Sequence, residues 1–294
     1  MEIIQEITHP LFTEKKVQVH VLRLDLYQPE IGGNKYFKLK YNLEQARLGN
    51  HSTLLSFGGA YSNHIAALAN AGKIYGFKTI GIIRGDELEI NSNKTIQQAS
   101  ENGMHLHFIN RELYRKKNDT NFIEKLHQLF GEFYLIPEGG SNVFAVKGCK
   151  EIIDLIPFPA DIICCAVGTG GTIAGIQLSS ENNQQIIGIP VLKNATFLYN
   201  DILSLQEKFY SQILNEKPKS KLELIFDYHF GGYAKSTKEL EQFQINFQKE
   251  FQIPLDKIYT AKLFYAVFDL IKKDFFQPEQ KIILLHTGGL QSEA

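Results

Sequence analysis

The order of elements along this 294-residue chain predicts an α/β protein of two domains, each a parallel twisted sheet flanked by helices. Short runs rich in β-branched and aromatic residues alternate with amphipathic stretches of helical period. The strand runs lack a strict alternation of apolar and polar residues, which is typical of strands buried on both faces. About ten strands exceed what one regular sheet usually holds, and this favours two sheets.

The predicted elements follow one another without long gaps. In the first half, the strands cover residues 53–57, 78–83, 105–109 and 133–136, and the helices cover 62–75, 93–102 and 121–129. In the second half, the strands cover 162–167, 185–189, 222–226 and 282–285, and the helices cover 145–155, 172–178 and 197–214, with two more helical patterns before the last strand. Because strands lead into helices, the loops at their carboxyl ends are the places to search for ligand sites.

Breaks in the pattern near residues 37–41 and 139–145 predict where the two domains join. We expect a large domain formed by residues 1–40 and 145–294, with a small α/β domain, residues 41–144, inserted within it. No repeat, low-complexity segment or long linker separates the two parts.

Composition excludes several classes of protein. Hydrophobic residues make up 44% of the chain, which argues against disorder, and the formal net charge of −1 gives no reason to expect nucleic acid or an anionic membrane as a partner. No apolar run is long enough to span a bilayer and no signal-peptide pattern opens the chain, so we expect a cytoplasmic protein. The cysteines, Cys149 and the adjacent pair Cys164 and Cys165, predict buried thiols and neither a disulfide framework nor a metal site.

A glycine- and threonine-rich loop follows the predicted strand at 162–167. Residues 168–172 read Gly-Thr-Gly-Gly-Thr and open the next helix, so backbone N–H groups and two hydroxyls can face a phosphate. A dinucleotide-binding loop needs a glycine where this chain has Ile173, and the following strand does not end in an acidic residue. Alone, the loop is equally consistent with a phosphate site and with a tight turn that binds nothing.

Lys35 lies in the sequence Gly-Gly-Asn-Lys, just before a helical pattern. A lysine at such a turn can bind a carbonyl cofactor as a Schiff base, although most lysines in this context are solvated. Small-residue turns at 58–64, 139–142 and 286–289 also follow predicted strands, and Ser62 would cap the helix that begins beside it, a seat for a substrate carboxylate. Together with the phosphate loop, these turns favour pyridoxal phosphate (PLP) and an amino-acid substrate.

The ordered set of these segments resembles one family of PLP enzymes. The segments are 32–35, 62–64, 136–142, 168–172, 258–262 and 286–289. Their order and spacing are similar to those of the 1-aminocyclopropane-1-carboxylate (ACC) deaminase / D-cysteine desulfhydrase family, and the resemblance covers nearly the whole chain. It implies the tryptophan synthase β-subunit-like fold (fold type II), PLP as cofactor and a homodimer.

The resemblance also implies a role for each site residue. Lys35 would be the Schiff-base lysine and would remove the substrate's Cα proton, a task helped by burial and nearby positive groups that lower its pKa. Asn63 would bond the cofactor's ring oxygen, and Tyr233 and Tyr259 are similar to two active-site tyrosines. The implied catalytic residues are Lys35, Ser62, Tyr233 and Tyr259; the cofactor-binding residues are Lys35, Asn63, Gly168, Thr169, Gly170, Gly171, Thr172 and Thr287; the substrate-binding residues are Ser62, Asn63, His64 and Tyr259.

Two threonines bear on the choice of substrate. In ACC deaminases of this family, glutamate is typical at the position of Thr260 and leucine at that of Thr287. A carboxylate near the pyridine nitrogen keeps that nitrogen protonated, as ring opening requires, whereas a hydroxyl does not. The resemblance therefore favours a lyase that converts D-cysteine, or a similar small D-amino acid, to pyruvate, ammonia and hydrogen sulfide. ACC deaminase, a hydrolase of amino-acid metabolism, is the alternative.

Two positions depart from the family pattern. Phe37 stands where a basic residue is usual and is followed by Lys38, and Tyr61 would bring a phenol near the substrate carboxylate. These departures leave open a catalytically weak PLP-binding protein that acts as a reservoir or sensor. A nucleotide-binding regulatory module is disfavoured because the Rossmann and P-loop patterns are missing.

Overall fold

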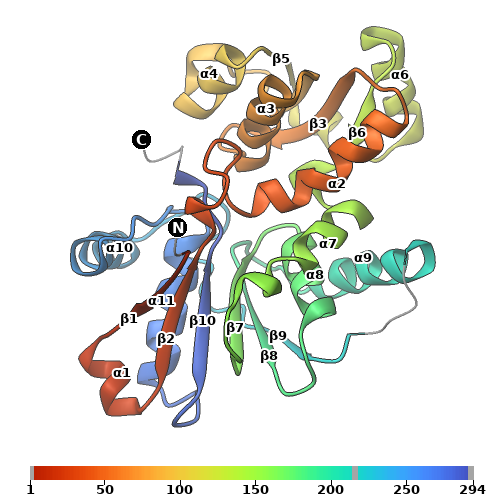
Figure 1. Cartoon of the computed structure of the whole chain (residues 1–294). Coiled ribbons are helices and arrows are strands. Elements are labelled where there is room, and N and C mark those ends of the chain that lie inside the picture. Colours follow the sequence, from red (N-terminus) through yellow and green to blue (C-terminus); the bar gives the residue numbers. More distant parts are fainter. Residues whose placement is uncertain (1–2, 214–217, 291–294) are drawn as a thin grey trace.

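A computed structural model describes residues 3–213 and 218–290, which form two sheets, one above the other in Figure 1. The large sheet has the order β1-β2-β10-β7-β8-β9 and the small sheet has the order β5-β4-β3-β6. The large sheet comprises β1 (Ile4–Ile7), β2 (Gln18–Arg23), β7 (Ile162–Val167), β8 (Gln185–Pro190), β9 (Lys221–Leu224) and β10 (Lys281–His286). The small sheet comprises β3 (Thr53–Gly59), β4 (Lys78–Arg84), β5 (Met104–Ile109) and β6 (Tyr134–Ile136).

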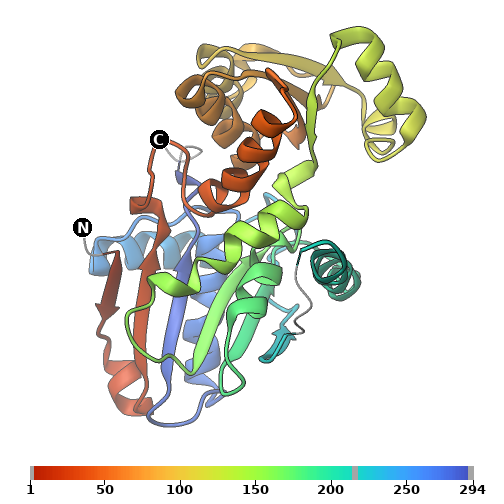
Figure 2. The same cartoon turned by 45° about the vertical axis from the view of Figure 1, so that its right-hand side comes forward.

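Helices cover both faces of each sheet, as Figures 1 and 2 show. They are α1 (Pro10–Lys15), α2 (Asn34–Leu48), α3 (Asn63–Tyr75), α4 (Lys94–Glu101), α5 (Arg111–Tyr114), α6 (Thr120–Phe130), α7 (Val143–Lys150), α8 (Gly171–Ser179), α9 (Leu198–Gln212), α10 (Lys238–Phe251) and α11 (Thr260–Lys272). Short 3-10 turns are η1 (Leu24–Leu26), η2 (Ile90–Ser92), η3 (Glu138–Gly140) and η4 (Ile153–Leu155).

Alternate residues of β7 show why the strands read as continuous apolar runs. Ile162 and Cys164 belong to the core beneath α1, α10 and α11, whereas Ile163 and Cys165 belong to the core beneath α7, α8 and α9. Both cysteines and Cys149 are buried free thiols, as predicted. The small sheet is covered in the same way, by α2, α3 and α4 on one face and by α5 and α6 on the other.

The eight predicted strands are confirmed within a few residues, and three details differ. The strands β1 and β2 were not among them, and β1 pairs antiparallel to β2, so the large sheet is not wholly parallel. The helix predicted over 145–155 ends at Lys150 and is followed by a turn and η4, and Pro157 holds Ile156, the residue after η4, in extended backbone. Residue 214, the predicted end of α9, lies outside the described residues.

Helix α2 leads from the large sheet to the small sheet and runs unbroken through residue 40. The division into residues 1–40 with 145–294 and residues 41–144 therefore stays a prediction, with one of its boundaries inside a helix. Among the helices of residues 3–213 and 218–290, none combines the length and apolarity that crossing a bilayer requires.

Candidate active site

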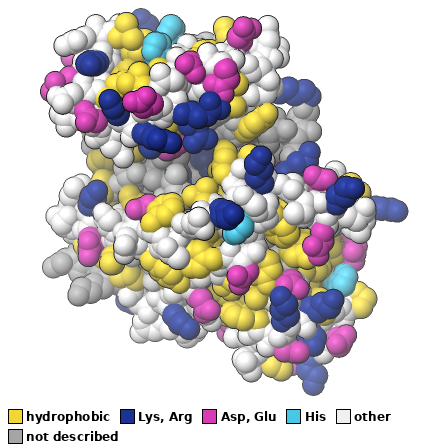
Figure 3. All heavy atoms as spheres, turned by 180° about the vertical axis from the view of Figure 1, so that it is seen from behind, with side chains coloured by type: hydrophobic (Ala, Val, Ile, Leu, Met, Phe, Trp, Pro, Cys, Tyr) yellow, Lys and Arg dark blue, Asp and Glu magenta, His cyan; other side chains and the backbone are white. Residues whose placement is uncertain are grey.

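A cavity of about 280 Å³ lies where the carboxyl ends of the strands of both sheets meet. Gly59 and Arg84, at the ends of β3 and β4, line it from the small sheet, and Gly168 and Thr287, which follow β7 and β10, line it from the large sheet. All four small-residue turns singled out in the sequence contribute to its wall. From behind, Figure 3 shows the surface hollowed between the upper and lower parts of the molecule, with basic side chains along the upper edge.

Lys35 lies in the first turn of α2, and its Nζ donates to Asn34 Oδ1 at 2.8 Å. Gly33, the N-cap of α2, has a φ of +55°, and a Cβ there would lie 2.2 Å from the carbonyl oxygen of Thr287. Only glycine permits this close approach. Asn34 fixes the turn further, because its backbone N–H donates to Thr287 O at 3.2 Å and its Nδ2 donates to Thr172 Oγ1 at 2.8 Å.

The environment of Lys35 suits a nucleophile and a base. Burial, and then the positive charge of Lys38, lower the pKa of Lys35 to about 7. A large share of its amine is therefore unprotonated at neutral pH, the form that attacks a carbonyl carbon. Both causes agree with those expected for the Schiff-base lysine.

The loop at 168–172 and Lys38 form one end of the cavity, called the phosphate end below because its donors fit that group. Lys38 Nζ donates to Gly139 O at 2.8 Å and to Ser141 Oγ at 3.0 Å, and Ser141 Oγ lies 2.6 Å from Thr169 Oγ1. A Cβ at residue 171, a glycine, would lie 2.6 Å from that same Ser141 Oγ, so the loop has no room for a side chain there. This end of the cavity offers donors that fit a phosphate. They are the Lys38 ammonium, which has no carboxylate partner among the described residues, two hydroxyls and the N-terminus of α8.

The departure at Phe37 does not remove the basic group from the site. Phe37 is 2% exposed and stacks on Tyr27, with ring centroids 5.3 Å apart, in the core beneath α7. Lys38, the next residue, reaches the cavity instead. No role was predicted for Lys38. Its spacing of three residues from Lys35 could have placed both side chains on one face of the helix.

The N-terminus of α3, where the sequence predicts a seat for a substrate carboxylate, borders the cavity. Ser62 caps the helix as expected, since its Oγ accepts from Ile65 N at 3.3 Å, and Asn63 and His64 line the cavity beside it. His64 is buried, with Nε2 2.8 Å from Ser56 Oγ. Burial, followed by the charges of the two nearby lysines, lowers the pKa of His64 well below its usual value, so the ring is neutral.

Tyr61 does not enter the site. Its side chain is 46% exposed, and Tyr61 is not among the described residues that line the cavity. The expectation of a phenol near the substrate carboxylate is therefore wrong. Its carbonyl oxygen instead accepts from the hydroxyl of Tyr233 at 3.4 Å.

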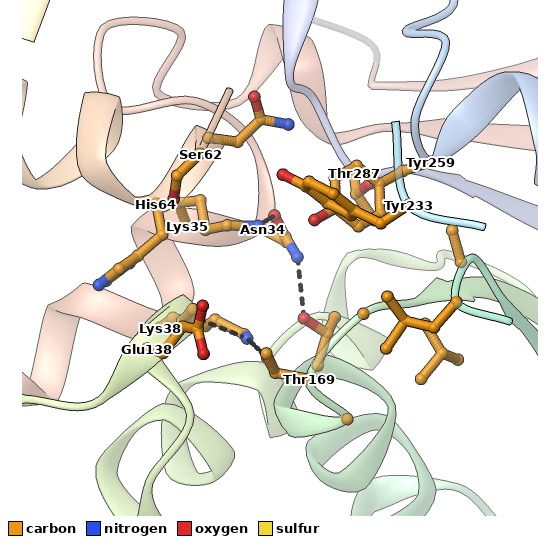
Figure 4. Close-up of a pocket in the computed structure, with 18 of the residues that line it drawn as sticks. Asn34, Lys35, Lys38, Ser62, His64, Glu138, Thr169, Tyr233, Tyr259 and Thr287 are labelled. Carbon is orange, nitrogen blue, oxygen red and sulfur yellow. Dashed lines mark hydrogen bonds between the residues drawn. The ribbon is translucent and has the colours of Figure 1, made fainter. Parts of the chain in front are cut away.

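Tyr233 and Tyr259 lie together on the wall of the cavity, facing Lys35 in Figure 4. Their ring centroids are 6.2 Å apart at an interplanar angle of 71°. Burial raises the pKa of both hydroxyls, that of Tyr259 well above its usual value, so both tyrosines are protonated donors at neutral pH.

Of the two threonines expected near the cofactor, only Thr287 lines the cavity. Thr260 is fully buried, and its hydroxyl donates to Asp256 Oδ2 at 2.6 Å. Asp256 also accepts from the backbone N–H groups of Tyr259 and Thr260, at 2.8 and 2.9 Å, and so fixes the start of α11. The hydroxyl of Thr260 is therefore committed to this carboxylate, and Thr260 is not among the described residues that line the cavity.

Arg84 and Glu138 are wall residues that the sequence analysis missed. Glu138 accepts from the Tyr114 hydroxyl at 2.6 Å and lies 3.4 Å from Lys117 Nζ, and the Arg84 guanidinium lies 5.7 Å from the Tyr114 ring centroid. Glu138 belongs to the segment 136–142, and Arg84 ends β4, but neither stands in a pattern that signals chemistry. Within the described residues, no cluster of His, Cys, Asp or Glu is arranged to hold a metal ion.

Comparison with known proteins agrees with this geometry. A family model described as pyridoxal-phosphate dependent enzyme matches residues 8–288. A Pyrococcus furiosus protein assigned as an ACC deaminase is 31% identical over an alignment of 290 positions that covers 92% of this chain and 84% of the relative. The mitochondrial bifunctional D-cysteine desulfhydrase/ACC deaminase of Arabidopsis thaliana is 27% identical, with 93% of this chain and 72% of the relative covered. The crystal structure of an ACC deaminase homologue matches with a TM-score of 0.86 and 28% identity, over 98% of this chain and 89% of that one.

The matched range contains every loop that forms the cavity, from the turn before Lys35 to Thr287. The architecture, parallel sheets flanked by helices, is that of fold type II PLP enzymes. The chain belongs to the family of pyridoxal-phosphate dependent enzymes and, within it, is related to the ACC deaminases and D-cysteine desulfhydrases.

Proposed function

We propose that the protein is a PLP-dependent lyase that acts on D-cysteine or a similar small D-amino acid and releases pyruvate, ammonia and hydrogen sulfide. The observation that supports this most is the half-buried Lys35 on the cavity wall, whose pKa is lowered to about 7, opposite two protonated tyrosines. A base on one side and hydroxyl donors on the other are what the loss of a Cα proton and of a Cβ thiolate require.

The residues at the phosphate end would hold the cofactor. The Lys38 ammonium, the Thr169 and Ser141 hydroxyls and the N–H groups of the loop at 168–172 would bind its phosphate, and Lys35 would bind its carbonyl carbon. When bound there, PLP supplies an electron sink for the negative charge that develops at Cα.

The remaining residues orient the substrate and move protons. The cap of α3 at Ser62 offers N–H groups to the substrate carboxylate, which the positive end of the helix also attracts. Lys35 Nζ takes the Cα proton, and the hydroxyls of Tyr233 and Tyr259 are placed to protonate the departing sulfur. Burial of these groups limits access of water and keeps the donors aligned before reaction.

The choice of substrate rests on Thr287, the wall residue where ACC deaminases of the resembled family typically have leucine. ACC deamination is the second candidate, because the Pyrococcus furiosus relative and the crystallised homologue carry that name and the Arabidopsis thaliana relative carries both. A homodimer, which rests on the family resemblance, and the cytoplasmic location expected from the sequence complete the proposal.

The test is release of pyruvate and sulfide from D-cysteine by the PLP-loaded protein, with L-cysteine, D-serine and ACC as parallel substrates. Equal amounts of pyruvate and sulfide, from D-cysteine in preference to L-cysteine, would support the elimination. Ammonia released from ACC, without turnover of D-cysteine, would replace the proposal with the second candidate. Cofactor absorbance without turnover of any of the four would favour a PLP-binding role.

A further inference from the structure

The segment that carries Tyr233 has an unusual backbone. It lies between β9 and α10 without regular secondary structure, and Phe230, Gly231, Gly232 and Ala234 all have positive φ, of 51°, 92°, 114° and 54°. Non-glycine residues rarely adopt this conformation, and it persists only where surrounding contacts hold it. The position of Tyr233 over the cavity therefore depends on what anchors residues 229–234.

The anchor is the side chain of Lys262, in the first turn of α11. Lys262 is fully buried, and its Nζ donates to Gly232 O at 2.7 Å and to His229 O at 2.9 Å. One acceptor belongs to the residue directly before Tyr233, and Lys262 itself lies three residues after Tyr259. A single ammonium group therefore joins the two backbone segments that carry the active-site tyrosines.

The chemistry of the Lys262 hydrogen bonds argues that this side chain does more than fill space in the core. Burial lowers the pKa of Lys262 to about 8, although the charge of Asp256 opposes the shift. Buried lysines are rare because the charged form loses its hydration. Among the described residues, the two carbonyl oxygens are the only hydrogen-bond acceptors of this Nζ, and both belong to the segment 229–234.

The far end of that segment reaches across the cavity. The Tyr233 hydroxyl donates to Tyr61 O at 3.4 Å, directly before the helix cap Ser62, and the Tyr233 ring packs edge-on against Tyr259. A shift of Gly232 would move Tyr233 relative to both. We propose that Lys262 is a positioning residue that holds Tyr233 in place beside Tyr259, a role whose kinetic consequence rests on the proposed function.

The first measurement does not depend on activity. The amides of Gly232 and Lys235 donate to His229 O and Gly232 O, the same carbonyls that Lys262 binds, so hydrogen exchange at these amides reports on the anchor. In cofactor-free protein, Lys262→Met is expected to speed exchange across 229–235 by about tenfold, the effect of losing a typical charged hydrogen bond. The control Leu270→Ala, a core position on α11, is expected to lower the melting temperature without faster exchange in this segment.

The second measurement separates positioning from general damage. With PLP-loaded protein and D-cysteine, Lys262→Met is expected to lower kcat about fivefold to tenfold, with the cofactor absorbance unchanged. In a Tyr233→Phe background, the same substitution is expected to lower kcat by about twofold at most, because coupled residues are not additive.

The outcomes distinguish the two proposals. Unchanged exchange at 229–235 in Lys262→Met, or an equal fall in kcat in both backgrounds, would overturn the role of Lys262. Absence of wild-type turnover of D-cysteine would count against the proposed function alone, and the exchange measurement would then decide whether Lys262 anchors the segment.

Discussion

The two ends of the cavity are built in different ways. At the phosphate end, the loop at 168–172 and Lys38 act through backbone N–H groups and through hydrogen bonds of Lys38 Nζ to Gly139 O and Ser141 Oγ. At the tyrosine end, Tyr233 lies on an irregular segment, and its hydroxyl reaches Tyr61, 172 residues away in the chain. Both ends depend on contacts between distant segments, but short sequence motifs carry the residues of the first end, whereas an irregular segment carries Tyr233 at the second.

This difference separates cofactor binding from substrate choice. The N–H groups of the loop at 168–172 and the Lys38 ammonium can bind a phosphate whichever residues form the opposite end of the cavity, since these donors do not belong to the segment 229–234. The tyrosines, in contrast, depend on Asp256 and Lys262, which fix the start of α11 and the segment 229–234. Substitutions at the two ends should therefore produce separable effects, except at Lys35, which serves both.

Lys35→Ala is expected to have the largest effect. Removing the amine eliminates both the covalent attachment of the cofactor and the base for the Cα proton, so turnover should fall by about a thousandfold or more. Loss of the absorbance of Lys35-bound cofactor and of pyruvate release from D-cysteine would be recorded together. Lys40→Ala is a matched control on α2, because Lys40 Nζ binds Glu151 outside the cavity. Retained turnover in Lys35→Ala would refute the mechanism.

Lys38→Met should weaken the phosphate end, and it also removes one positive neighbour of Lys35. The loss of a charge-assisted contact to the phosphate is expected to raise the dissociation constant for PLP by about 10- to 100-fold, while kcat at saturating PLP changes much less. Titration of the cofactor-free protein with PLP would measure this, with Lys40→Met as the control. An unchanged affinity would mean that Lys38 does not bind the phosphate.

The same contrast explains how much the sequence could predict. Some site features are local patterns that neighbouring residues in the sequence reveal. They are the loop at 168–172, the cap at Ser62 and Lys35, and the structure brings all of them to one cavity. The hydrogen bond of Thr260 to Asp256 could not be predicted, because it depends on where α11 begins. The orientation of Tyr61 likewise depends on packing that no residue type reveals. The strand β1 escaped prediction because it is only four residues long and two of them are polar.

The pH dependence of cofactor binding tests Lys35, the residue that serves both ends of the cavity. Burial disfavours the ammonium form of Lys35, so the fraction of neutral amine rises as pH increases through about 7. The rate at which cofactor-free protein binds PLP is therefore expected to rise about tenfold between pH 6 and pH 8 and then level off. In Lys38→Met the midpoint should move to higher pH, because one positive neighbour is gone. A rate that still climbs steeply above pH 9 would show an ordinary lysine pKa.

Tyr233→Phe should have the smallest effect on kcat, and it tests most directly whether the two ends of the cavity act independently. The ring keeps its packing against Tyr259, and only the hydroxyl that donates to Tyr61 O and faces the cavity is lost. A neutral hydrogen bond of this kind is worth about 1 kcal/mol, so kcat with D-cysteine should fall about fivefold. The affinity for PLP should stay at the wild-type value, because no atom of Tyr233 contributes to the phosphate end. If PLP affinity fell together with kcat, the two ends would be coupled, and substrate choice could not change independently of the cofactor site.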